Sequence, residues 1–141
     1  PEVPRVFPVG RLDKETTGLL LLTNDGRMTY DLTHPSKEHE KEYEVKVSPD
    51  ISNGALEKLK GGISILGEKT RPTIINRLSK NSFGITLTEG KNRHIRRICR
   101  KVGVEVVALK RVRIGSFIMK NIELGKYRVL DQNAIKLLKS I

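Results

Sequence analysis

The hydrophobic positions along the chain change period several times, and each change predicts a new element. Four leucines and a threonine over 19–23 are typical of a buried strand, and the following Asp25-Gly26 of a turn. Apolar residues at alternate positions over 42–47 predict a strand with one buried face. Further strands are expected over 6–9, 73–78, 82–88, 104–109 and 112–118, with 73–78 and 82–88 forming a hairpin around Lys80-Asn81.

Helical spacing marks the remaining segments. Residues 53–59 predict a helix, capped by Ser52 or Asn53 and ended by Gly61-Gly62. The apolar residues over 95–102 recur at i, i+3, i+4 and i+7, which predicts an amphipathic helix. They are Ile95, Ile98, Cys99 and Val102. Short helices are also expected over 28–32 and after Asp131. Strands dominate with helices among them, so the predicted fold class is α+β with a mixed, largely antiparallel sheet.

Length and composition limit the possible functions. The 141 residues fit one domain, and the single cysteine excludes a disulfide framework or a cysteine-based zinc site. Cys99 lies on the apolar stripe, so we interpret it as a buried small hydrophobe. The three histidines lack the spacing of metal ligands. We therefore expect no metal, no membrane span and a cytoplasmic location.

The positive charge is concentrated in one segment. The formal net charge is +11, and residues 89–113 hold nine Lys or Arg against two Glu, which is +7 of that total. Guanidinium groups bind phosphates bidentately and stack on bases, so a nucleic-acid surface is one interpretation and a solvated basic face is the other. The expected helix carries Arg93, Arg96, Arg97, Arg100 and Lys101.

Two residues have both a structural and a functional interpretation. Asp13 lies in a polar loop between Gly10 and Gly18, where glycine lets the backbone turn sharply and another molecule approach. Its carboxylate is either a structural partner of Arg11 or a catalytic group. Tyr43 is either a half-buried aromatic residue of its strand or part of a site. The pattern alone favours the structural interpretation at both positions.

Several motifs, in order, resemble those of one enzyme family. Gly-Arg-Leu-Asp at 10–13 and Gly-Leu-Leu-Leu-Leu-Thr-Asn-Asp-Gly at 18–26 look like the catalytic motif of pseudouridine synthases of the RsuA, RluB, RluE and RluF type. Residues 41–45 resemble the tyrosine motif of that family, and residues 89–98 its third motif. The resemblance runs from about Val9 to the C-terminus, so it is far more specific than any single motif.

This resemblance implies the pseudouridine synthase catalytic fold and isomerisation of uridine to pseudouridine in ribosomal RNA. The stretch 41–47 and the last helix favour the RluF branch, which acts on large-subunit (23S) rRNA. Asp13 would be the essential carboxylate. It would act as nucleophile on C1′ or C6, or abstract a sugar proton on the way to a glycal, and the sequence leaves these routes open.

The same resemblance implies roles for the other candidate residues. Tyr43 would stack on the target uracil, Arg96 would pair with Asp13, and Leu109 would pack near the flipped base. RNA binding would fall to Arg11, Lys91, Asn92, Arg93, Arg97, Arg100 and Lys101. The family needs no metal or organic cofactor, and we expect a monomer.

Two alternative functions have to be weighed against pseudouridine synthesis. A basic RNA-binding module that assists ribosome assembly without chemistry would need the basic helix but not Asp13, Tyr43 and Arg96. A metal-dependent nuclease is disfavoured because no cluster of carboxylates surrounds Asp13.

Family members usually carry an N-terminal S4-type RNA-binding domain and an early strand motif containing Lys-Pro. Neither occurs here, so we expect residues 1–141 to be a partial catalytic domain of a longer protein.

Overall fold

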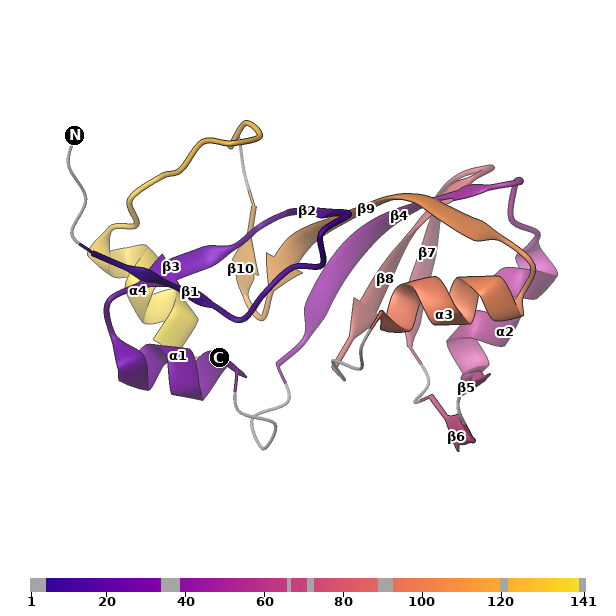
Figure 1. The fold of residues 1–141 in the computed structure, drawn as a ribbon, viewed down its shortest axis with the longest axis horizontal. Coiled ribbons are helices and arrows are strands. Elements are labelled where there is room, and N and C mark those ends of the chain that lie inside the picture. Colours follow the sequence, from indigo (N-terminus) through magenta and orange to yellow (C-terminus); the bar gives the residue numbers. More distant parts are fainter. Residues whose placement is uncertain are drawn as a thin grey trace.

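The chain forms an α+β fold around a mixed, mostly antiparallel sheet, as the sequence predicted (Figure 1). The fold is that of a computed structural model, which describes residues 5–33, 39–65, 67–70, 73–88, 93–119 and 122–139. The main sheet has six strands in the order β10-β9-β4-β8-β7, with β2 pairing parallel to β9. Its strands are β2 (Thr16–Gly18), β4 (Lys41–Ser48), β7 (Ile74–Ser79), β8 (Ser82–Leu87), β9 (Glu105–Ile114) and β10 (Phe117–Ile118).

Smaller elements surround this sheet. Two antiparallel pairs lie outside it, β1 (Phe7–Val9) with β3 (Leu21–Thr23) and β5 (Ser64–Ile65) with β6 (Glu68–Lys69). The helices of the described residues are α1 (Gly26–Thr33), α2 (Asn53–Gly61), α3 (His94–Lys101) and α4 (Gln132–Lys139). None of them has the length and apolar character of a membrane span.

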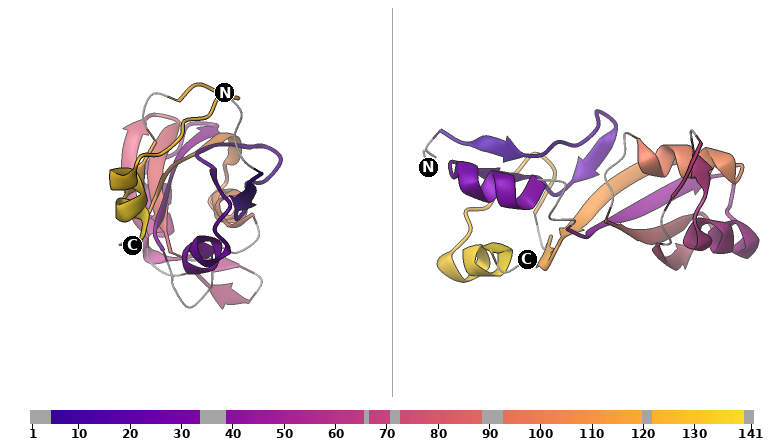
Figure 2. Two further views of the ribbon diagram at one scale, coloured as in Figure 1. Left: turned by 90° about the vertical axis from the view of Figure 1, so that its left-hand side faces the viewer. Right: turned by 90° about the horizontal axis from the view of Figure 1, so that it is seen from below.

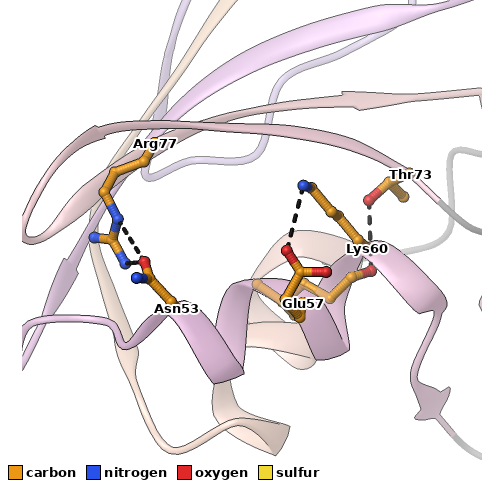
Figure 3. Close-up of polar contacts among 6 residues, drawn as sticks. Asn53, Glu57, Lys60, Thr73 and Arg77 are labelled. Atoms are coloured by element: carbon orange, nitrogen blue, oxygen red, sulfur yellow. Dashed lines mark hydrogen bonds and ion pairs between the residues drawn. The ribbon is translucent and has the colours of Figure 1, made fainter.

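Helix α2 shows how local sequence sets an element and its place. The hydroxyl of Ser52 accepts a hydrogen bond from the Ala55 backbone N–H at 3.1 Å, as expected of an N-cap. Gly62 ends the helix with φ +98°, a left-handed conformation that suits glycine. Arg77 of β7 donates through Nε and Nη2 to the Asn53 side-chain oxygen at 3.2 and 2.8 Å, tying α2 to the hairpin (Figure 3).

Two separate hydrophobic cores lie at opposite ends of the elongated molecule (Figures 1 and 2). In the larger core, α2 and α3 pack their buried residues against β4, β7, β8 and the first half of β9. The smaller core joins β1, β3 and α1 to the far end of β9 and to β10. Leu109 belongs to the larger core and Ile114 to the smaller one. Strand β9 therefore connects the two cores.

The structure differs from the predicted elements in several places, and the short strands β5 and β6 were not predicted. Strand β9 is one continuous strand, where the sequence predicted separate strands over 104–109 and 112–118. Lys110-Arg111 looked like an interruption, but Arg111 is buried within the strand and hydrogen-bonded there. The apolar run over 19–23 forms a strand only from Leu21. Strand β2 was not predicted, because its Thr-Thr-Gly sequence has no hydrophobic period.

Cys99 is a core residue, as the sequence indicated. Its side chain is fully buried on the inner face of α3, and burial raises its pKa to about 12. Because the unfolded thiol ionises near pH 9.0, Cys99 contributes its full stabilisation below that pH. The contribution is lost as pH rises towards 12.

We predict that the Cys99 thiol of the folded protein resists alkylation. Iodoacetamide at pH about 8.5, near the reference pKa of a free thiol, should leave the native protein unlabelled and label it fully in urea. The free energy of unfolding should fall between pH 9.0 and 12, and by less in Cys99→Ala. Mass spectrometry and urea titrations measure the two effects. Rapid labelling of the native protein would contradict the assignment.

Candidate functional site

Residues from five segments line one cleft of about 430 Å³ between the two cores. The segments are the loop between β1 and β2, strands β4, β8 and β9, and the first turn of α3. Six of the residues predicted from the sequence line this cleft: Arg11, Asp13, Tyr43, Arg93, Arg96 and Leu109. The structure thus brings together side chains that lie far apart along the chain.

The loop that carries Asp13 is held to β9 by backbone contacts. The Thr16 N–H donates to the Asp13 carbonyl at 2.9 Å, which closes a turn before β2. Strand β2 then pairs with β9, so that Thr16 lies beside Leu109. At the end of β2, the Leu19 N–H donates to the Arg111 carbonyl at 2.8 Å. A second hydrogen bond joins the same two residues, because the Arg111 side-chain Nε donates to the Leu19 carbonyl at 2.9 Å.

Gly18 makes this close approach possible. Its φ is +109°, and a Cβ placed on it would lie 2.2 Å from the Arg111 carbonyl oxygen. A side chain at position 18 would therefore be strained in its backbone and would clash with β9. The glycine that bounds the Asp13 loop is thus required for the join between β2 and β9.

Tyr43 and Leu109 contribute to the apolar lining of the cleft, together with Leu12, Leu87 and Ile95. They lie on the adjacent strands β4 and β9, where Tyr43 is opposite Arg111 and Val45 opposite Leu109. Leu109 is buried in the larger core, and the half-buried Tyr43 packs against that core. Tyr43 is therefore a strand aromatic and a cleft residue at once, so its two sequence interpretations are compatible.

Two arginines of the α3 segment hold the Asp13 loop through Glu15. The Arg93 Nη1 lies 3.1 Å from the Glu15 carboxylate, and the Arg96 Nη2 donates to the Glu15 carbonyl at 3.3 Å. Hydrogen bonding and charge attraction from Arg93 lower the pKa of Glu15. Among the described residues, Asp13 forms no ion pair with Arg11 or with Arg96. The predicted pairing of Arg96 with Asp13 is therefore absent among the described residues, and Arg96 contacts the Glu15 backbone carbonyl instead.

Three of the other predicted RNA contacts do not line the cleft. Arg100 pairs with Glu105 at 3.2 Å, and Lys101 is exposed at the end of α3. Arg97 is half-buried on the same helix. Lys91 and Asn92 lie outside the described residues.

Seven of the thirteen cleft residues were not predicted as site residues, and three of these have ionisable side chains: Lys41, His94 and Arg111. Lys41 shares the strand face of Tyr43 because the two are two residues apart in β4, a signal that was available in the sequence. Arg111 lies two residues after Leu109 in the same way, but the predicted break in β9 concealed it. Within the described residues, no group of His, Cys, Asp or Glu is arranged to hold a metal ion.

We predict that Gly18→Ala destabilises the protein by more than about 2 kcal/mol, because the added methyl group meets the β9 backbone in a strained conformation. Gly26→Ala is the matched control, since a Cβ at position 26 meets nothing within 4 Å. It should change the free energy of unfolding by less than about 0.5 kcal/mol. Urea denaturation measures both, and equal midpoints would show that the join does not depend on Gly18.

Comparisons with known proteins agree with the fold and the motifs. Residues 1–101 match the family model described as RNA pseudouridylate synthase. The dual-specificity RNA pseudouridine synthase RluF of Escherichia coli K12 is 41% identical over 138 residues, which cover 97% of this chain and 48% of RluF. The ribosomal large subunit pseudouridine synthase B of Bacillus subtilis 168 is 36% identical over 143 residues, covering 97% of this chain and 59% of that protein.

A solved structure shares the fold. It is the crystal structure of a pseudouridylate synthase, 33% identical, with a TM-score of 0.88 over 94% of this chain and 59% of that one. The chain spans about half the length of the RluF proteins it matches, 48% in the Escherichia coli K12 example. From its motifs, its fold and these similarities, the chain belongs to the RNA pseudouridylate synthase family.

Proposed function

We propose that this protein isomerises uridine to pseudouridine in ribosomal RNA, and that the reaction takes place in the cleft around Asp13. The observation that carries the proposal is the meeting of Asp13, Tyr43 and Arg96 in one cleft, from three separate segments of the chain. The names of the similar proteins support RNA as substrate, and the large-subunit enzyme of Bacillus subtilis supports 23S rRNA.

Asp13 is the residue that we assign to the chemistry. It is the one acidic side chain among the described residues that line the cleft. The reaction breaks the N1–C1′ bond, turns the uracil and joins C5 to C1′, while the proton on C5 is lost and N1 gains one. A carboxylate can serve as nucleophile at C1′ or C6, or as the base that removes a sugar proton. Both routes stay open.

Tyr43 and Leu109 are assigned to holding the base. A uridine within folded RNA is out of reach of a side chain in a cleft, so the nucleotide must be flipped out, which costs a few kcal/mol. Stacking of the uracil on the Tyr43 ring, with Leu109 packed beside it, would offset part of that cost. The cleft of about 430 Å³ lies within the roughly 300–1,000 Å³ typical of small-molecule sites.

The arginines of α3 and Arg11 are assigned to the RNA backbone, where they neutralise phosphates. Arg93 and Arg100 already contact Glu15 and Glu105, so each would share its guanidinium group between that carboxylate and RNA. We further propose that the protein works as a monomer in the cytoplasm, without a metal ion or organic cofactor.

We predict that Asp13→Asn abolishes pseudouridine formation and leaves RNA affinity within about threefold of wild type, because binding depends on phosphate neutralisation by the arginines. The test is pseudouridine mapping of rRNA from cells that lack the gene, complemented with the wild type or with the variant. Asp50→Asn, at an exposed position of the chain, is the isosteric control and should restore the modification.

The two possible results separate the two functions. Loss of one modified uridine, restored by the wild type and Asp50→Asn but not by Asp13→Asn, supports the enzyme. An unchanged pseudouridine pattern in cells lacking the gene argues against the enzyme and for the RNA-binding module without chemistry.

A further inference from the structure

Two cations with no assigned role lie side by side in the cleft. Lys41 of β4 and Arg111 of β9 both line it, on neighbouring strands of the main sheet. Arg111 is 4% exposed, and Lys41 is half-buried. Burial, and then repulsion by Arg111, lower the pKa of Lys41. The two charges are therefore close enough to oppose each other.

No acidic partner neutralises either cation within the described part of the chain. Arg111 donates through Nε to the Leu19 carbonyl at 2.9 Å, but its Nη2 is enclosed without a hydrogen-bond partner. The salt bridges of the described residues include neither Lys41 nor Arg111. Asp13 lines the same cleft and pairs with neither of them.

Arg113, two residues further along β9, is paired with carboxylates, as partly buried cations usually are. Its guanidinium lies 2.9 Å from the Glu42 carboxylate and 3.3 Å from that of Glu40. Hydrogen bonding to Glu42, above all, raises the pKa of Arg113. The same strand thus gives acidic partners to Arg113, which does not line the cleft, and none to Arg111, which does.

An enclosed cation without a counterion destabilises the folded protein, because burial removes the water that would solvate its charge. Such a cost is expected where a ligand of opposite charge completes the site. Arg93 and Arg96 line the same cleft, so an anion entering it would meet positive charge from both β9 and α3. A neutral group would leave the charges of Lys41 and Arg111 unbalanced.

We propose that Lys41 and Arg111 form a receptor for a single phosphate group of the RNA nucleotide that occupies the cleft. The proposal rests on the proposed function only in taking that nucleotide to be RNA. The Lys41 ammonium donates to a phosphate oxygen directly, as a compact charge on a flexible stem. Arg111 contributes without donating to the phosphate directly. Its enclosed guanidinium adds positive charge, and it holds Leu19, and with it the Asp13 loop, in place.

The first test measures RNA affinity as a function of salt. The probe is a single-stranded RNA pentanucleotide with one central uridine between adenosines, bound to the complete protein carrying Asp13→Asn so that no turnover occurs. Adding Lys41→Gln should weaken binding about tenfold at low salt, the effect of losing one hydrogen bond between charged groups. It should also reduce the slope of log K against log salt by about 0.7, as for one phosphate contact on a single strand.

Two further variants separate the charge of Lys41 from its packing. Lys46→Gln removes an exposed lysine of the same strand that does not line the cleft, and should change neither affinity beyond about twofold nor the slope. Lys41→Arg keeps the charge and should restore most of the slope. The proposal is overturned if Lys41→Gln binds RNA as tightly as its parent. It is also overturned if Lys41→Gln binds RNA more weakly but the salt slope is unchanged, because Lys41 would then donate to a neutral acceptor such as a uracil carbonyl.

The second test locates the phosphate. A methylphosphonate removes the charge of one linkage, 5′ or 3′ of the central uridine. At one of the two linkages, it should weaken binding by the parent protein about as much as Lys41→Gln does, and should weaken binding by Lys41→Gln no further. Equal losses in the two proteins at both linkages would mean that Lys41 contacts neither phosphate, and would overturn the proposal.

One further probe reports on the proposed function alone. Replacing the central uridine by adenosine should weaken binding by the parent protein if the cleft receives uridine. Unchanged affinity would count against uridine isomerisation. The coupling between Lys41 and a phosphate linkage would still be measurable, so the two failures are distinguishable.

Discussion

The parallel join between β2 and β9 is the constraint on which the site depends. It links residues 92 positions apart in the sequence, through the mutual hydrogen bonds of Leu19 and Arg111. Gly18 permits the approach, because any side chain there would meet the β9 backbone. Without this join, only the contacts of Glu15 with Arg93 and Arg96 would connect the Asp13 loop to the larger core, which contains Leu109 and packs against Tyr43. The join is what brings the carboxylate to the cleft.

The cleft is built largely on regular secondary structure. Its walls are strands and the first turn of a helix, and Leu109 serves the larger core and the cleft alike. Side chains fixed by core packing hold a reacting group more precisely than side chains on free loops. The Asp13 loop gains the same support from two directions, from β9 through its backbone and from α3 through Glu15. A base placed on Tyr43 would thus lie on a fixed surface.

Charge is distributed unequally between the inside and the outside of this site. The described cleft residues carry five cationic Lys or Arg side chains and one carboxylate, Asp13. Outside the cleft, two basic residues of the same elements have acidic partners: Arg100 has Glu105, and Arg113 has Glu42. A polyanion that enters the cleft therefore replaces repulsion among cations by attraction. The net charge of +11 favours the same class of partner from a longer distance.

The sequence by itself determined the elements with clear periodicity, namely α2, α3, β4 and the β7–β8 hairpin, because periods of 3.6 and 2 follow from backbone geometry. Its motifs also determined the family and six of the thirteen residues that line the cleft. Only the tertiary structure decided that β9 is one strand, that β2 joins it, and that Lys41 and Arg111 share the cleft with no salt-bridge partner among the described residues. These features depend on pairing and burial between distant segments, and no local pattern of residues records which segments will meet.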